Sequence, residues 1–182
     1  MLPAMSIALS PTSYLVLGCL ATGGPATPYE LKQAVTGGIG YFWSFPHSQL
    51  YSEPARLAAA GYVSEEREEG GRRRRVFSIT DTGRAALQAW LADATDELPE
   101  IRDIALLKLF FGAQSDPQAL VALADVQREA HRRRLETYEA LDAAAGADRT
   151  RSAAGATLGL GLAFERAATA FWASIADNPP TD

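Results

Sequence analysis

Apolar side chains recur every three or four positions along most of this chain, and in one short interval they alternate with polar ones. Residues 10–24 predict a helix, because a serine cap and a proline open the segment and two glycines close it. Residues 27–38 repeat that order, with a threonine as the cap. Residues 46–61 predict a third helix, in which Leu50 and Leu57 share one face.

The alternating interval follows the third helix and predicts a two-stranded hairpin. Residues 62–68 form the first strand, residues 69–71 the turn and residues 72–80 the second strand. Residues 80–94 then predict a fourth helix, with Trp90 on its inward face. This order is that of a winged helix-turn-helix, in which an exposed helix enters the DNA major groove and the hairpin, or wing, touches the flanking backbone.

The second half of the chain has a helical pattern throughout. The sequence predicts helices over residues 99–113 and 117–145, and a last helix after the break at residues 145–149 that reaches about residue 176. Long amphipathic helices with spare apolar surface are typical of a dimerisation module, although they could also fold back to complete one monomeric core. The predicted fold class is therefore mainly α, with an α+β head. It comprises a winged helix-turn-helix DNA-binding domain over 10–95, a helical dimerisation and effector domain over 96–177, and a disordered tail over 178–182.

The distribution of charge changes this picture more than the net charge of −5 does. Residues 1–95 carry eight basic and eight acidic residues, whereas residues 96–182 carry nine basic and fourteen acidic residues. The neutral first half can still create a local positive field at Arg72–Arg75. The chain lacks a run of about 18 apolar residues and a signal-peptide pattern, and it has a single cysteine, so we expect a cytoplasmic protein without a membrane span.

The sequence contains no candidate catalytic centre, cofactor site or metal site. Its two histidines, His47 and His131, have no companion at a metal-binding spacing. Its paired glycines end helices and do not form a phosphate-binding loop. Arg132–Arg134 lie in the middle of a helix and spread over a wide arc, so we expect a solvated face on which they pair with neighbouring glutamates.

Four stretches in order resemble the PadR family of bacterial transcriptional regulators: "YLVLGCLATGGPATPYELKQAV", "FWSFPHSQLYSEPARLAAAGYVSEERE", "GRRRRVFSITDTGRAALQAWL" and "LLKLFFG". The resemblance is close over about residues 13–112 and general as far as about residue 176. It implies a homodimeric repressor that binds a pseudo-palindromic double-stranded operator and releases it when a small hydrophobic or aromatic effector binds. The alternative is a winged-helix protein-interaction module without DNA binding.

The resemblance also implies the DNA-contacting residues. These are Ser48, Gln49, Tyr51 and Arg56 in the recognition helix, and Arg72, Arg73 and Arg74 in the wing. Glutamine can pair with adenine, while serine and tyrosine mostly contact phosphates. Arg56 could instead form a salt bridge, and Arg75 is expected to pair with the acidic strand opposite.

Pro54 departs from the family pattern, because it replaces an apolar residue inside the recognition helix. It predicts a helix that is bent or starts late. With the neutral head, it is the feature that favours the alternative without DNA binding.

The remaining candidates concern aromatic and apolar side chains. An apolar effector pocket would draw on Trp43, His131 and Trp172, while Trp90, Phe110 and Phe111 are expected in the core. The expected dimer interface comprises Leu120, Leu123, Leu135, Tyr138, Phe164 and Phe171.

Overall fold

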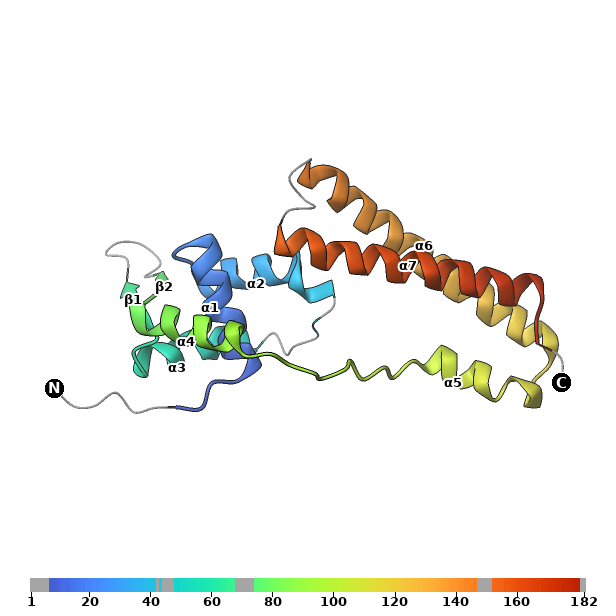
Figure 1. Ribbon diagram of the computed structural model, residues 1–182, viewed down its shortest axis with the longest axis horizontal. Helices are drawn as coiled ribbons and strands as arrows, with labels where there is room; N and C mark the ends of the chain where they lie inside the picture. Colours follow the sequence, from blue (N-terminus) through green and yellow to red (C-terminus); the bar gives the residue numbers. More distant parts are fainter. Residues whose placement is uncertain (1–6, 42, 44–47, 68–73, 147–151, 181–182) are drawn as a thin grey trace. The chain divides into compact units, whose positions relative to one another are not determined.

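The computed structural model describes residues 7–41, 43, 48–67, 74–146 and 152–180. The chain divides into two compact units, Met1–Glu97 and Leu98–Asp182, each with its own apolar cluster (Figure 1). The division falls close to the predicted domain boundary at residues 95 and 96.

The first unit has the element order of a winged helix-turn-helix, as predicted. It comprises α1 (Pro11–Gly23), α2 (Pro28–Thr36), a short 3-10 turn η1 (Ile39–Tyr41), α3 (Gln49–Ala59), β1 (Val63–Arg67), β2 (Arg75–Ile79) and α4 (Asp81–Ala92). Both predicted caps are present: Ser10 and Ser13 form a capping box on α1, and Thr27 and Glu30 form one on α2. Each box satisfies backbone N–H groups that the first helical turn leaves without a partner.

The core of this unit lies where α1, α2, α3 and the hairpin meet. Its fully buried members include Val16, Leu17, Leu20, Leu31, Val35, Leu50, Leu57, Val63 and Phe77. In the antiparallel hairpin Glu65 is opposite Phe77, and Arg67 is opposite Arg75. The sequence did not predict that Ala26, just before α2, also pairs with Phe77 through backbone hydrogen bonds of 3.0 and 2.9 Å.

The third helix starts at Gln49 and continues through Pro54 to Ala59. The predicted late start is therefore wrong, whereas the predicted bend stays a prediction. Pro54 has no N–H to donate to the Leu50 carbonyl, which removes one hydrogen bond from the second turn. Its ring is fully buried, so Pro54 supplies the apolar contact that the position requires.

The second unit is a long helical hairpin with a short helix beside it. It comprises α5 (Ile104–Phe110), a 3-10 turn η2 (Gly112–Gln114), α6 (Pro117–Ala145) and α7 (Ala153–Asp177). Figure 1 shows α6 and α7 side by side along most of their length. In the described residues, no helix is both long and apolar enough to cross a bilayer.

The predicted helix over 99–113 is shorter in the structure. Its start is at Ile104, because the Asp103 carboxylate accepts hydrogen bonds from the Ala105 and Leu106 N–H groups and so caps the helix there. Ile101 therefore lies outside the helix.

Three aromatic residues predicted in the core are exposed. Phe110 is 81% exposed and Phe111 is 59% exposed, because the short helix α5 packs against the rest of the unit mainly through Ala105. Trp90 lies on the surface of the first unit, where its ring stacks on Tyr14 with centroids 4.5 Å apart.

Candidate nucleic-acid interface

The third helix presents a polar face to solvent and an apolar face to the core. Leu50 and Leu57 are fully buried, whereas Ser48, Gln49 and Tyr51 are exposed. These three predicted DNA-contacting residues therefore lie together at the start of a helix whose opposite face is fixed by packing. A helix held in this way can present its N-terminal side chains to base edges.

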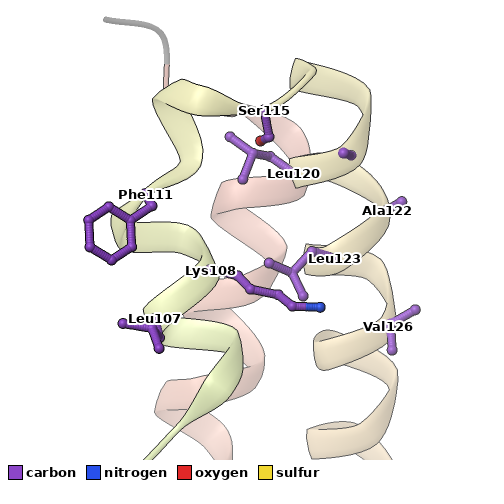
Figure 2. Close-up of a pocket in the computed structure, with 9 residues that line it drawn as sticks. Leu107, Lys108, Phe111, Ser115, Leu120, Ala122, Leu123 and Val126 are labelled. Atoms are coloured by element: carbon purple, nitrogen blue, oxygen red, sulfur yellow. The ribbon is translucent and has the colours of Figure 1, made fainter.

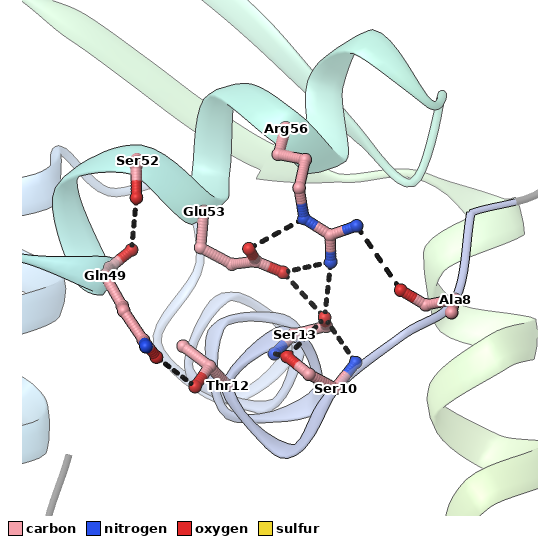
Figure 3. Close-up of polar contacts among 8 residues, drawn as sticks. All are labelled: Ala8, Ser10, Thr12, Ser13, Gln49, Ser52, Glu53 and Arg56. Atoms are coloured by element: carbon pink, nitrogen blue, oxygen red, sulfur yellow. Dashed lines mark hydrogen bonds and ion pairs between the residues drawn. The ribbon is translucent and has the colours of Figure 1, made fainter. Parts of the chain in front are cut away.

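Arg56, on the same helix, makes an intramolecular ion pair with Glu53. Its Nε donates to Glu53 Oε2 at 2.8 Å, and its Nη2 donates to Glu53 Oε1 at 2.6 Å and to Ser13 Oγ at 2.9 Å (Figure 3). The Nη1 group reaches the Ala8 carbonyl at 3.3 Å. Of the two roles that the sequence left open, the structure shows the salt bridge.

Glu53 is the centre of this network. The residue is only 8% exposed, and its Oε1 also accepts a 2.6 Å hydrogen bond from the Ser13 hydroxyl. The hydrogen bonds from Arg56 hold the pKa of Glu53 below its ordinary value, against the opposing effect of burial. The network thus joins the first turn of α1 to the middle of α3, and sequence reasoning missed it because the partners are forty positions apart.

Two further polar contacts lie on the exposed side of this unit. Thr12 Oγ1 donates to Gln49 Oε1 at 2.9 Å, across α1 and α3. On α2, Gln33 Nε2 donates to the Tyr29 hydroxyl at 2.9 Å, and Tyr29 is 59% exposed. Because the Tyr29 oxygen accepts this bond, its O–H remains to donate to an acceptor such as a phosphate. In the sequence Tyr29 is an aromatic residue at the start of a predicted helix, and the structure adds its exposure.

In the wing, the structure pairs Arg75 with the opposite strand, as predicted. Its Nε and Nη2 donate to the two carboxylate oxygens of Glu65, both at 2.7 Å, and its guanidinium carbon lies 5.3 Å from the centroid of the Phe77 ring. Arg67 adds a 3.1 Å bond to Glu65. These bonds, chiefly those from Arg75, lower the pKa of Glu65 to about 2.

Of the other wing arginines, Arg74 is exposed and directly precedes the second strand. Arg72 and Arg73, predicted to contact DNA, lie outside the described residues.

The three residues predicted to line an effector pocket belong to different units of the chain. Trp43 belongs to the first unit, while Trp172 is 2% exposed and packs against small alanines of α5 and α6. His131 lies farther along α6, where its Nδ1 is 2.6 Å from Glu165 Oε2. Glu165 is itself 2% exposed. Packing therefore buries Trp172, and Glu165 pairs with His131, while their role in an effector pocket stays a prediction.

The second unit instead contains an apolar groove of about 630 Å³ between α5 and α6 (Figure 2). Its walls include Leu107, Phe111, Leu120, Leu123 and Val126, with the Lys108 ammonium on the same surface.

The six residues predicted at a dimer interface divide into three pairs. Leu120 and Tyr138 are buried, Leu123 and Leu135 are half-buried, and Phe164 and Phe171 are exposed. Their own chain covers the first pair; Tyr138, for example, packs against Gly161, and the interface itself stays a prediction. Other exposed apolar side chains of this unit are Leu98, Ile101, Ile104, Leu106, Leu107, Phe110, Phe111, Val126 and Leu160.

The arginines of α6 form ion pairs along the helix, as predicted. Arg132 pairs with Glu129 and Glu136, and Arg133 pairs with Glu129. Arg134 differs, because it lies 3.7 Å from the buried Glu165 of α7. In the part of the chain that the structure describes, no group of His, Cys, Asp and Glu side chains could hold a metal ion.

Family models match both units of the chain. Residues 16–89 match the Transcriptional regulator PadR-like family, and residues 101–176 match Virulence activator alpha C-term. The Negative transcriptional regulator PadR of Bacillus subtilis is 30% identical over 101 residues, which is 54% of each chain, so the match spans about half of that relative. The Probable transcriptional regulator Rv1176c of Mycobacterium tuberculosis is 29% identical over 134 residues, which is 66% of this chain and 69% of that protein.

The fold is also that of solved structures of Bacillus subtilis PadR. The structure in complex with operator DNA has a TM-score of 0.81 at 22% identity and covers 92% of this chain and 98% of that chain. The structure in complex with p-coumaric acid has a TM-score of 0.73 at 22% identity and covers 93% and 97%.

Proposed function

The chain belongs to the PadR-like family of transcriptional regulators, and from this premise we propose that it binds operator DNA through the exposed face of α3. One observation carries the proposal: Ser48, Gln49 and Tyr51 lie exposed on the first turn of a helix that packing and the Glu53 network hold rigidly. Gln49 would contact a base edge, while Ser48 and Tyr51 would contact phosphates.

Further DNA contacts are proposed for Tyr29 on α2 and for the wing. Tyr29 can donate its hydroxyl hydrogen to a phosphate. Arg74, with Arg72 and Arg73, would supply charge to the flanking backbone. Arg56 and Arg75 are not included, because Glu53 and Glu65 hold their guanidinium groups.

Binding is tested by fluorescence anisotropy on duplexes from the region upstream of the protein's own gene, at a series of salt concentrations. The logarithm of the operator binding constant should fall linearly with the logarithm of the salt concentration, because phosphate contacts release condensed cations. Gln49→Ala should lower the preference for operator over unrelated DNA, whereas Arg74→Ala should weaken both and reduce the salt slope. If the wild-type protein binds no duplex at low salt, the proposal is wrong.

We also propose that the working form is a homodimer joined through the second unit. Its support is the number of large apolar side chains on α5 and α7 that one chain leaves in water, Phe110 and Phe164 among them. A two-fold dimer would present two α3 helices to half-sites about one helical turn apart. Sedimentation equilibrium should give a dimer for the wild type, and Phe110→Ser with Phe164→Ser should shift it toward monomer; a monomeric wild type would refute this.

The proposed regulatory ligand is a small hydrophobic or aromatic molecule that releases the operator. The support is the apolar groove between α5 and α6 and the binding of p-coumaric acid by the Bacillus subtilis relative. Anisotropy with p-coumaric acid and other aromatic acids as competitors tests it: dissociation of the DNA complex supports release, and an unchanged complex with every compound refutes it for that class. No catalytic step is part of this function, and its place of action would be the cytoplasm.

A further inference from the structure

Two neighbouring residues in the first turn of α1 contact α3 through side chains. Ser13 is fully buried and its hydroxyl donates to Glu53, while Thr12 lies nearer the surface and its hydroxyl donates to Gln49 (Figure 3). The Ser13 hydroxyl also accepts from the Ser10 N–H at 2.8 Å, so the capping box of α1 and the contacts to α3 share one side chain. The first turn of α1 is thereby held in a fixed place relative to α3.

We propose that Thr12 is a positioning residue that sets the orientation of the Gln49 carboxamide and so determines the base preference of α3. This inference rests on the proposed function. The 2.9 Å bond from Thr12 Oγ1 turns the Oε1 branch of the amide toward α1. The Nε2 branch on the other side of the amide is then left to donate outward.

The orientation has a consequence for recognition. A glutamine that pairs with adenine in two places must use its oxygen and its nitrogen together, accepting from N6 and donating to N7. An amide whose oxygen already faces α1 offers mainly a donor, which suits guanine O6 and N7 or thymine O4. Because a glutamine side chain loses substantial rotamer freedom when it is ordered, holding it before DNA arrives also reduces the cost of binding.

Thr12→Val tests the inference, because valine keeps the branched shape and removes the hydroxyl. The matched control is Thr22→Val on the same helix, where the hydroxyl donates only to the Gly18 carbonyl at 2.9 Å. Full-length wild type and both variants are used to select sites from a randomised duplex pool. Affinities are then measured for the preferred operator and for an unrelated duplex, with circular dichroism melting as the folding check.

We expect Thr12→Val to change the preferred base at one symmetric pair of operator positions, toward adenine. Loss of one hydrogen bond should weaken the original operator by roughly three- to tenfold and leave unrelated DNA unchanged. Thr22→Val should match the wild type. Gln49→Ala should abolish the preference at the same positions, and adding Thr12→Val to it should change nothing more.

The inference is overturned if Thr12→Val selects the same sites with the same affinity as Thr22→Val. It is equally overturned if Thr12→Val weakens operator and unrelated DNA by the same factor, because that pattern indicates a purely structural role. A wild type that binds no duplex would remove the proposed function and this inference with it, a result distinct from the other two.

Discussion

Replacing Arg56 with methionine isolates the contribution of the Glu53 network to the stability of the first unit. The change removes both hydrogen bonds from the guanidinium to the carboxylate and leaves Glu53 with only the Ser13 hydroxyl. Where solvent is excluded, each such charge-assisted bond contributes about 1.5–3 kcal/mol. The Arg56 side chain is 40% exposed, so water replaces part of the loss, and we expect a destabilisation of about 2 kcal/mol.

The double variant Arg56→Met with Glu53→Met gives the sharper test. It also removes the Glu53 carboxylate that has lost its arginine partner, so the double variant should be about 1 kcal/mol more stable than Arg56→Met alone. Arg67→Met is the matched control, because that arginine is 70% exposed and makes one 3.1 Å contact to Glu65, which predicts a change below about 0.5 kcal/mol.

Hydrogen–deuterium exchange on peptides from α1 and α3 measures the change in stability of the first unit separately from the second unit. Urea denaturation is the independent check. The reasoning is refuted if Arg56→Met behaves like Arg67→Met. It is also refuted if the double variant is less stable than Arg56→Met alone.

Three further predictions concern pH, packing and capping. Because the pKa of Glu53 is lowered by folding, its contribution to stability is present above the ordinary glutamate value of 4.5 and is lost as pH falls through the lowered value. The protection of the α1 and α3 amides, corrected for their intrinsic exchange rates, should therefore fall more steeply in acid in the wild type than in Glu53→Gln. In α7, Gly161→Ala should lower Tm, at a cost of about 1–2 kcal/mol, because its Cβ would lie 2.9 Å from the Tyr138 ring. The Cβ of Gly159→Ala meets open space, so this variant should raise Tm and stabilise the protein by about 0.5–1 kcal/mol. Equal changes in Tm for the two alanine variants would contradict the close contact between Gly161 and Tyr138. Asp103→Ala should raise exchange of the α5 amides, since a lost cap costs about 1 kcal/mol, and unchanged exchange would show that the cap is not needed.

The elements of the first unit could be predicted because their signals are local. Serine or threonine caps, a proline at the first helical position and terminal glycines fix α1 and α2, and the alternating pattern identifies the hairpin. The Arg75–Glu65 pair was also accessible, because neighbouring strands of a short hairpin restrict which side chains can meet.

The network between α1 and α3 could not be predicted, since it depends on how two helices forty residues apart pack. Nothing local distinguishes Glu53 from a solvated glutamate. The exposure of Phe110 was missed for the opposite reason: an apolar residue at helical spacing reads as core whether its own chain or another surface covers it.

The ion pairs of α6 bear on how the molecule would approach a polyanion. Arg132 and Arg133 are neutralised by glutamates on their own helix, so they add little outward positive potential, and residues 96–182 keep their excess of five negative charges. A neutral segment joined to an acidic one has an electric dipole, and a negatively charged surface exerts a torque on it that turns the acidic end away. The acidic second half would thereby help to orient the molecule before contact. Added salt would limit the distance over which this torque acts to about the Debye length.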